Sequence, residues 1–250
     1  MLRLYFNWNA VCAQKVVLCL TEKGIDWTPH HLVLSNFEQL EPWYLDINPA
    51  GLVPALVHDD VIVTESTVIN EYLEDAFPEV QLRPTSPAAR ARMRWWTKQI
   101  DDVLHPSIRP ISFAKFVTPR AARLSRADLD GIMARTPKKE IATLWRRVAE
   151  APYSDQELAD YLAKIRNLVE TMETALSRSR WLAGDGVSLA DLGMTPYFRR
   201  LVQLEKEAVW SDLPATCAWW DAIRARPSFA MFDRLRAQYA PADHPANPTA

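Results

Sequence analysis

Residues 53–68 hold the feature that most constrains the fold: a short apolar run that opens with proline, a polar turn, a second apolar run and a helix. Proline cannot donate to a strand ladder, and it pushes the residue before it, here Val53, into extended geometry. If the Val53–Pro54 bond is cis, the Val53 N–H and C=O are turned outward. The helix is predicted to begin at Glu65 and Ser66, directly after the hairpin.

The groups at the two ends of this unit suit a small zwitterionic peptide. Amide groups at a helix N-terminus bind a carboxylate, and the Ser66 hydroxyl adds a donor there. Glu65 offers an anion to an ammonium group, and the outward-facing Val53 peptide groups can pair with a ligand backbone. One carboxylate, one ammonium and one peptide backbone describe the γ-glutamyl-cysteinyl part of glutathione.

Val-Pro followed by Glu-Ser at this spacing resembles the glutathione S-transferases, and the resemblance covers most of the chain, from Leu2 to about Phe232. The block over 47–101 is closest in appearance to bacterial β-etherases of the LigF type, which cleave lignin-derived β-aryl ethers with glutathione. The resemblance implies an α/β thioredoxin-like N-terminal domain followed by an all-helical C-terminal domain. It also implies glutathione as co-substrate and a reaction without a metal.

Periodicity and proline placement divide the chain along the same lines. The predicted parts are a glutathione-binding domain over 1–79, a linker over 80–87, an all-helical domain over 88–240 and a flexible tail over 241–250. In the first domain we expect strands at 2–6 and 27–34, the hairpin, and helices at 10–23, within 37–47 and from 65 to 77. In the second we expect one long helix over 88–117 interrupted by prolines, a short helix within 138–149, an amphipathic helix over 155–177, a helix opened by a capping box at 188–191, and helices at 214–225 and 228–236.

The net charge of −2 predicts no strong affinity for polyanions, but the charges are unevenly distributed. Residues 1–82 hold 3 basic against 12 acidic side chains, and residues 83–147 hold 15 against 5. These are either two solvated faces or the two halves of a crossed homodimer interface. The resemblance also leaves a heterodimer open, because some β-etherases assemble from two different chains. No nucleic-acid recognition motif accompanies the arginines, so no nucleic-acid partner is expected.

The three cysteines are an odd number without paired spacing, which argues against a disulfide framework. The N-terminus shows no signal-peptide pattern, and no apolar run approaches the roughly 18–20 residues that span a bilayer. We therefore expect a cytoplasmic protein with reduced thiols and no membrane partner.

A glutathione enzyme must lower the thiol pKa and aim the sulfur, which in this family lies near the N-terminus of the first helix. The position where related transferases carry a Ser or Cys falls on Ala10, so the usual side chain is missing. Two catalytic candidates remain. Asn9 can cap the helix or turn its amide toward the thiolate. Cys12 is placed where the helix dipole depresses a thiol pKa, although a small buried core residue is the competing interpretation.

The resemblance assigns Gln39 to the glycine end of glutathione, with a solvated helix residue as the alternative. The second substrate is expected between the loop at 7–9 and the inner face of the long helix. Ten tryptophans and eight phenylalanines favour an aromatic ligand, although most of these rings belong to a core. The candidate pocket residues are Trp8, His105, Ile108, Arg109, Ser112, Phe113 and Phe116.

The sequence predicts a glutathione S-transferase that attacks an aromatic electrophile with glutathione thiolate and cleaves β-aryl ethers of lignin-derived ketones. Three alternatives stay open. The first is a general detoxifying transferase, and the second is a Cys12-dependent glutathione lyase or reductive dehalogenase. The third is a non-catalytic transferase-like protein that binds aromatic ligands.

Overall fold

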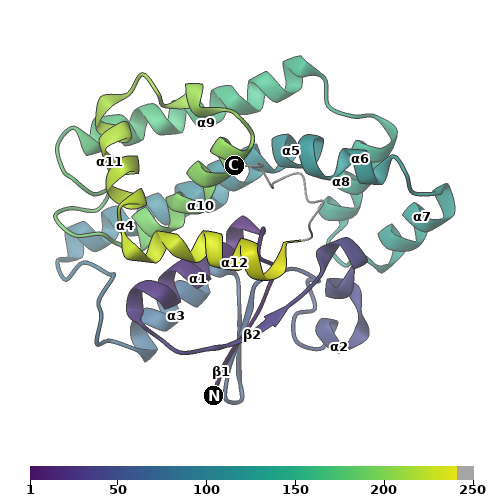
Figure 1. Ribbon diagram of the computed structural model, residues 1–250, viewed down its shortest axis with the longest axis horizontal. Helices are drawn as coiled ribbons and strands as arrows, with labels where there is room; N and C mark the ends of the chain where they lie inside the picture. The colour runs from purple at the N-terminus through teal and green to yellow at the C-terminus, as the bar shows by residue number, and fades with distance from the viewer. Residues whose placement is uncertain (241–250) are drawn as a thin grey trace.

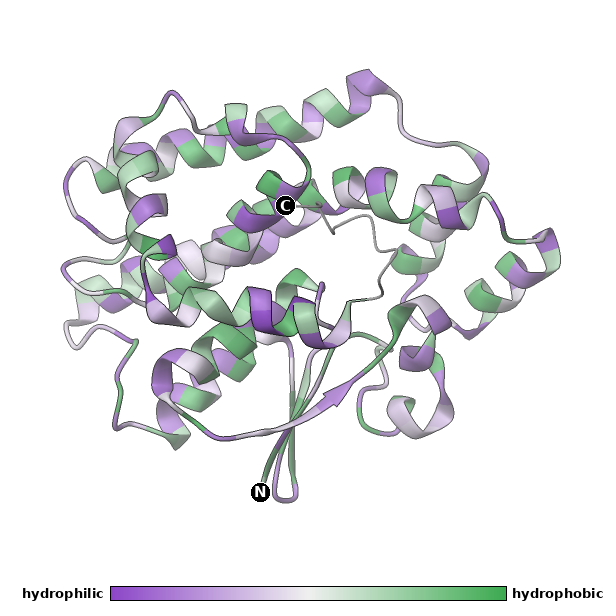
Figure 2. Ribbon diagram, viewed as in Figure 1, coloured by the Kyte–Doolittle hydropathy of each residue, from purple (hydrophilic) through white to green (hydrophobic). Residues whose placement is uncertain are grey.

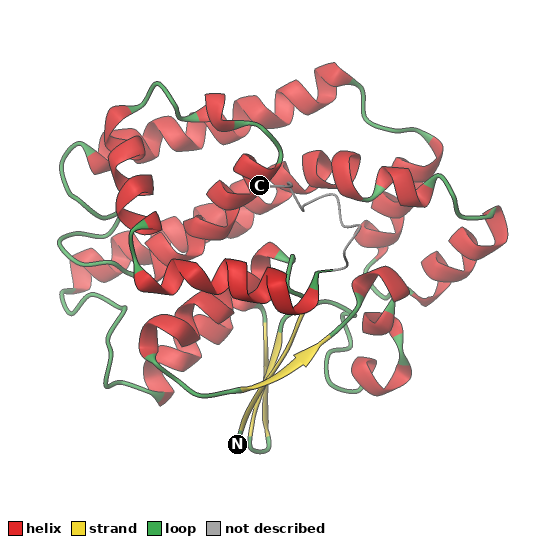
Figure 3. Ribbon diagram, viewed as in Figure 1, coloured by secondary structure: helices red, strands yellow, loops and turns green. Residues whose placement is uncertain are grey.

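The computed structural model describes residues 1–240, so the tail predicted to be flexible, 241–250, lies outside the described residues. Figure 3 shows the strands gathered beside the N-terminus and helices through the rest of the chain. Figure 1 shows the same division along the chain, with the C-terminal helices returning to lie across the sheet-containing part.

A four-stranded sheet in the order β2-β1-β3-β4 forms the N-terminal part. β1 (Leu2–Phe6) pairs in parallel with β2 (Thr28–His31) and antiparallel with β3 (Ala55–His58), which pairs antiparallel with β4 (Val61–Thr64). α1 (Val11–Lys23) joins β1 to β2, and α3 (Ser66–Ala76) follows β4. The predicted unit is confirmed. β2 is shorter than the expected 27–34 and contains Pro29, which an edge strand tolerates.

Alternation along β1 separates two apolar clusters. Leu4 and Phe6 face α1 and α3 and belong to the main core of the molecule. Tyr5 points to the other face, where its ring lies 5.9 Å from that of Tyr44 in α2 (Pro42–Leu45). The expected irregular helix over 37–47 is this helix preceded by two 3₁₀ turns, η1 (Leu34–Asn36) and η2 (Glu38–Leu40). Both sheet faces are therefore covered.

One long helical path leads from the N-terminal part into the helical part. α4 (Pro87–Gln99) continues through a π-helical segment, η3 (Ile100–Leu104), into α5 (His105–Phe116). Pro106 has no N–H, and its ring excludes the carbonyl four residues earlier, which accounts for the widened turn before it. The interruption predicted near His105-Pro106 is confirmed, whereas the one predicted near Arg109-Pro110 is wrong, because α5 continues through Pro110. The π-helical segment ends directly before His105.

Residues 117–150 form three short helices that return toward the sheet-containing part. They are α6 (Thr118–Ala121), α7 (Arg126–Arg135) and α8 (Lys139–Glu150). Ile132 packs on Phe37 and Leu40, and the Trp145 ring lies 5.2 Å from that of Phe37. The sequence predicted a short helix within 138–149 and did not predict α7.

The remaining helices build the core of the helical part, and α10 lies at its centre. α9 is amphipathic as expected, and Figure 2 shows apolar and polar residues alternating along it. No helix among residues 1–240 is long and apolar enough to cross a membrane. These elements are α9 (Asp155–Leu176), α10 (Leu189–Gln203), η4 (Glu207–Val209), α11 (Pro214–Arg224), η5 (Pro227–Ala230) and α12 (Met231–Tyr239).

A buried carboxylate fixes the start of α10. The predicted capping box is confirmed: Asp191 Oδ2 accepts from the Ser188 backbone N–H at 2.9 Å and from its hydroxyl at 2.8 Å. Asp191 Oδ1 accepts from the Leu182 N–H at 3.0 Å and from Trp219 Nε1 at 2.9 Å. Burial raises the Asp191 pKa, which these four hydrogen bonds partly oppose. The Asp191 side chain thus joins α10, α11 and the loop before α10 by hydrogen bonds, and its role is structural.

Asp191→Ala should lower the free energy of unfolding by about 3 kcal/mol, because it leaves buried donors of Leu182 and Trp219 without an acceptor. Urea denaturation followed by tryptophan fluorescence measures this loss. Asp185→Ala is the matched control, since Asp185 is exposed a few residues earlier, and it should change stability by less than about 0.5 kcal/mol. Equal losses of stability in the two variants would contradict this structural role of Asp191.

Candidate active site

The loop before α1 is held by its own asparagines. Asn7 Nδ2 donates to the Leu32 carbonyl at 2.9 Å, and the Asn9 N–H donates to Asn7 Oδ1 at 3.0 Å. Ala10 occupies the N-cap position of α1 and makes no side-chain cap. The first-turn amides of α1 therefore keep their positive partial charge at the junction of the two domains.

One of the two interpretations of the sequence expected Asn9 to cap α1. The structure contradicts it, because Ala10 is the N-cap and no side chain caps the helix. Asn9 Oδ1 accepts instead from Arg200 Nη2 at 3.0 Å, and the same nitrogen donates to the Asn9 carbonyl. Arg200 belongs to α10, so Asn9 joins the active-site loop to the helical core.

Cys12 lies in the first turn of α1 and faces two polar groups of the helical domain. Its Sγ is 3.6 Å from His105 Nδ1 on α5 and 3.8 Å from the Tyr197 hydroxyl on α10. The Tyr197 hydroxyl is itself 3.1 Å from His105 Nδ1. Arg109, one helical turn beyond His105, contacts the other ring nitrogen. A thiol, an imidazole and a phenol thus meet where three elements converge.

The environment of Cys12 favours its thiolate. Burial by itself raises the pKa of this thiol, but electrostatic interactions with His105 and Lys15 and hydrogen bonds from His105 and Tyr197 outweigh it and lower the pKa to about 6. Lys15 is buried, and its Nζ donates to Thr67 Oγ1 at 2.8 Å and to Asp101 at 3.1 Å. Cys12 is half-buried rather than sealed in the core, so the thiolate can meet a small reagent.

The other two thiols differ from Cys12. Cys19 is fully buried, and desolvation raises its pKa, as expected for a core residue. Cys217 is half-buried at α11, and its pKa is also raised by burial. Only Cys12, among the cysteines, combines access with an ionising environment.

The residues assigned to glutathione lie around one edge of the sheet. The Val53–Pro54 bond is cis, and within residues 1–240 neither the N–H nor the C=O of Val53 has a backbone partner. Ser66 begins α3 and is buried, while Glu65 before it is exposed. Glu65 adopts φ 65° and ψ 113°, a region that costs a non-glycine residue about 1–3 kcal/mol. Such strain is typical of functional positions.

Gln39 lies in η2 and is half-buried. Its Oε1 is buried without a hydrogen-bond partner in the described part of the chain, and a Cβ added to Gly51 would lie 3.4 Å from the Gln39 carbonyl. Gly51 takes φ +62° where Pro137 and Leu40 also approach closely, so a larger residue would not fit there. Gln39 therefore lies beside the loop that leads to Val53.

The segment over 117–150 also reaches this edge. Lys138 Nζ lies 3.6 Å from a Glu65 carboxylate oxygen, and Arg135 lies 3.6 Å from Glu41. Together with Arg94 and Arg83 on Glu71, these pairs join the acidic and basic thirds of the sequence within one chain. Part of the charge complementarity considered for a crossed dimer is thus satisfied inside the subunit.

The expected pocket residues fall into two groups. Trp8 and Ile108 are 3% and 1% exposed in the main core, so neither ring nor alkyl chain offers an open face in this conformation. The other five residues are half-buried along α5, on the side that carries the Cys12 contacts or the packing against α8. These are His105, Arg109, Ser112, Phe113 and Phe116.

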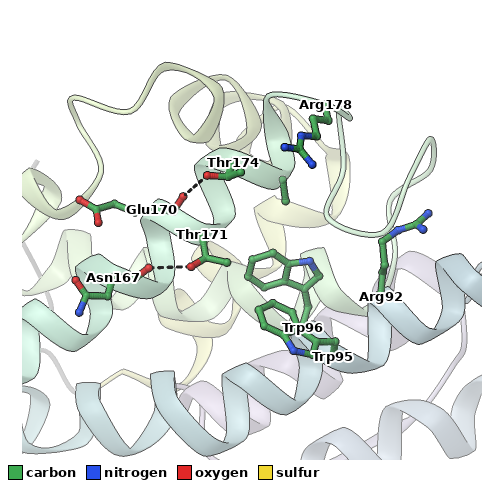
Figure 4. A pocket seen from close by; sticks show the side chains of 9 residues that line it. Arg92, Trp95, Trp96, Asn167, Glu170, Thr171, Thr174 and Arg178 are labelled. Carbon is green, nitrogen blue, oxygen red and sulfur yellow. Dashed lines mark hydrogen bonds between the residues drawn. The ribbon is translucent and has the colours of Figure 1, made fainter.

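An open groove of about 550 Å³ lies elsewhere, between α4 and α9. Figure 4 shows Trp95 and Trp96 on one side and Asn167, Thr171 and Thr174 on the other. None of the residues expected to bind glutathione or the second substrate lines it. This groove is therefore separate from the residues expected to carry the chemistry.

Comparisons with known proteins agree with the geometry. Residues 11–76 match the family model of the glutathione S-transferase N-terminal domain, and residues 136–227 match that of the C-terminal domain. Protein LigF of Sphingobium sp. (strain NBRC 103272 / SYK-6) is 36% identical over 95% of this chain and 95% of its own length. The chain belongs to the glutathione S-transferase family. The predicted family and the thioredoxin-like plus all-helical fold are confirmed.

Two solved structures place this transferase more closely. The crystal structure of β-etherase LigF from Sphingobium sp. strain SYK-6 superposes with a TM-score of 0.86 at 34% identity, covering 93% of this chain and 98% of that one. Glutathione transferase F7 from Populus trichocarpa superposes with a TM-score of 0.75 at 28% identity, covering 94% and 99%. The likeness to LigF extends over almost the whole length of both chains.

The sequence reasoning missed Tyr197, Arg200 and Lys138. Tyr197 and Arg200 are three residues apart on α10 and therefore share one face of that helix. An Arg199-Arg200 pair inside a mostly apolar helix was the available signal, since charged groups are rarely buried without a reason. Lys138 carried no signal, because its partner Glu65 is distant in sequence. In residues 1–240 no group of three His, Cys, Asp or Glu side chains could hold a metal ion.

The Cys12 thiolate should form with a midpoint near pH 6, because positive charge beside it favours the ionised form. Alkylation by iodoacetamide, followed by mass spectrometry of the Cys12 peptide, should rise through that pH. His105→Ala removes the largest favourable contribution and should move the midpoint up by more than about one pH unit. Cys217 in the same sample is the internal control and should react only at alkaline pH. A wild-type Cys12 midpoint in that alkaline range would contradict the proposed environment.

Proposed function

We propose that this transferase uses glutathione thiolate to displace an aryl alkoxide from the carbon next to a ketone, cleaving β-aryl ethers of lignin-derived compounds. The similarity to β-etherase LigF over nearly the full length of both chains is the observation that carries the proposal. Plant glutathione transferases match the same chain at lower identity than LigF does. This difference favours a β-etherase within the wider transferase family.

Glutathione is proposed to bind along the sheet edge described above. The Val53 peptide groups after the cis bond would pair with the cysteinyl backbone, and the Ser66 hydroxyl with the α3 amides would hold the γ-glutamyl carboxylate. Glu65 would receive the ammonium group. Gln39 would donate to the glycine carboxylate from its amide nitrogen, since its oxygen already lies buried.

This arrangement directs the sulfur toward the N-terminus of α1, beside Asn9. The thiolate attacks the carbon adjacent to the carbonyl, a carbon–sulfur bond forms, and the carbon–oxygen bond to the aryl group breaks with its electron pair. The carbonyl makes that carbon electrophilic, and a phenoxide leaves readily because its conjugate acid has a pKa near 10, as Tyr does. The protein's main contribution is to ionise the thiol and align it.

The electrophile is proposed to lie along α5, between the active-site loop and the segment over 117–150. Phe113 and Phe116 offer aromatic surface, and Ser112 offers a hydroxyl on the same helix. His105 and Arg109 place donors at the end of this strip that lies nearest Cys12. An aromatic ketone fits such a mixture of rings and a few polar groups.

A second candidate function is favoured by the Cys12 cluster. A half-buried thiolate beside His105 and Tyr197 has the properties of a nucleophile that attacks the sulfur of a glutathione thioether conjugate. The Cys12–glutathione disulfide forms, the carbon–sulfur bond of the conjugate breaks, and the carbon leaves with the electron pair and takes up a proton. In that case the enzyme would act as a Cys12-dependent lyase or reductive dehalogenase. The homodimer expected from the sequence stays a prediction in both cases.

Incubation with glutathione and each enantiomer of a β-aryl ether ketone tests the leading proposal. We expect phenol release and an equivalent amount of glutathione adduct from one enantiomer. No release from either enantiomer, by a protein that binds glutathione in calorimetry, would overturn the etherase proposal.

The Cys12→Ala variant separates the two candidate functions. If bound glutathione is the nucleophile, the variant should still cleave the ether within about tenfold of the wild-type rate. If Cys12 is the nucleophile, turnover should vanish. Cys217→Ala is the control for loss of a half-buried thiol outside the site, and it should leave both activities unchanged.

A further inference from the structure

Arg200 is a buried cation directed at the active-site loop. It is 7% exposed on α10, and its Nη2 donates to both oxygens of Asn9, the backbone carbonyl and Oδ1. Its guanidinium carbon lies 5.0 Å from the centre of the Phe116 ring on α5. Arg200 therefore stands between the loop that precedes α1 and the proposed electrophile pocket.

Arg200 has no carboxylate within ion-pair distance among residues 1–240, and its buried Nε has no acceptor there. Burial lowers its pKa to about 9, with a further decrease from Arg199, so the group remains charged at neutral pH. A buried charge without a counter-ion is strongly destabilising unless something at the site compensates it. By contrast, the half-buried Arg226 is paired with Glu22 at 2.6 Å.

The hydrogen bonds of Arg200 also determine how Asn9 is oriented. With Oδ1 turned to the guanidinium, the carboxamide nitrogen Nδ2, which is its only donor group, faces away from α10. Nδ2 has no hydrogen-bond partner in the described part of the chain. The donor lies in the loop whose next residue, Ala10, lacks the hydroxyl or thiol that would otherwise contact the glutathione sulfur.

We propose that Arg200 is a positioning residue that acts through Asn9 to ionise the thiol of bound glutathione, in place of the side chain missing at Ala10. The guanidinium holds and polarises the carboxamide, and Asn9 Nδ2 donates to the sulfur. The thiolate would supply the negative charge that the buried cation lacks. This inference rests on the proposed function, because it requires glutathione to bind beside Asn9.

Other charged and titratable groups surround Arg200 and must be separated from it. Tyr197 and Arg199 act on Arg200 from its own helix. Cys12 and Arg109 act on Tyr197, and Lys15 and His105 act on Cys12. Arg199 provides the matched control. It has the same chemistry one residue earlier, but its guanidinium lies 4.8 Å from the Phe232 ring and near Asp233, away from the loop.

The test measures the pKa of the glutathione thiol in the complex. The ultraviolet absorbance of the thiolate is titrated with pH as a difference between complex and free protein, in the wild type and again in a Cys12→Ala background. Arg200→Met should raise the pKa of the bound thiol by at least about one unit, which lowers kcat/KM about tenfold at pH values well below the wild-type thiol pKa. The loss should disappear at high pH, where the thiol ionises without help.

Three further variants keep the inference falsifiable. Arg200→Lys should raise the thiol pKa by less than Arg200→Met does, and Arg199→Met should leave it unchanged. Asn9→Ala should raise the thiol pKa as much as Arg200→Met, which tests the inference even if Arg200→Met folds poorly. An unshifted thiol pKa in Arg200→Met and Asn9→Ala, or a rate loss equal at every pH, would overturn the role of Arg200 and leave the proposed function standing. A wild-type protein that does not bind glutathione would overturn the proposed function as well.

Discussion

The packing of α1 against α10 determines where every group of the candidate site lies. α1 leaves the sheet with its first-turn amides uncapped, and its far side is covered by α3 and α10. The hydrogen bonds of Asp191 fix the start of α10. Tyr197 and Arg200, further along this helix, therefore contact Cys12 and Asn9 respectively. A rotation of either helix would separate these pairs. The buried Lys15 donates hydrogen bonds to Thr67 on α3 and Asp101 on η3, and these bonds also stabilise the junction.

Positive charge concentrates at this junction from several independent sources. The α1 dipole, Lys15 and Arg200 all act on a small volume at the N-terminus of α1. Anions form there at low cost, which is what a thiol-based transferase requires. The lowered pKa of Cys12 is an internal indication of that field, because a thiol in an ordinary buried position, such as Cys19, shifts the opposite way. Ionisation thus depends on the site as a whole rather than on one hydroxyl.

Local sequence signals predicted the sheet, α1 and α3, because Val53-Pro54 and Glu65-Ser66 act over short distances. The glutathione-binding roles of these residues stay predictions. Proline positions likewise predicted the interruption of the long helix before His105. The sequence could not predict the pairings of Arg200 with Asn9 or of Cys12 with His105 and Tyr197, since each joins residues that are distant along the chain. It also left α7 unassigned, because that helix is only weakly amphipathic and owes its place to contacts such as Ile132 on Phe37. Its place in the active-site loop made Trp8 a candidate pocket residue, whereas Trp8 packs into the core.

The central claim is that Asn9 and Arg200 ionise the glutathione thiol as one unit, at the junction of α1 and α10. A double-mutant cycle on the pKa of the bound thiol tests it most directly, with Asn9→Ala, Arg200→Met and the double variant measured in the same titration. The account predicts that the double variant shifts the pKa no further than either single variant, because each change breaks the same connection. Additive shifts would show that the two residues act independently and would contradict the account.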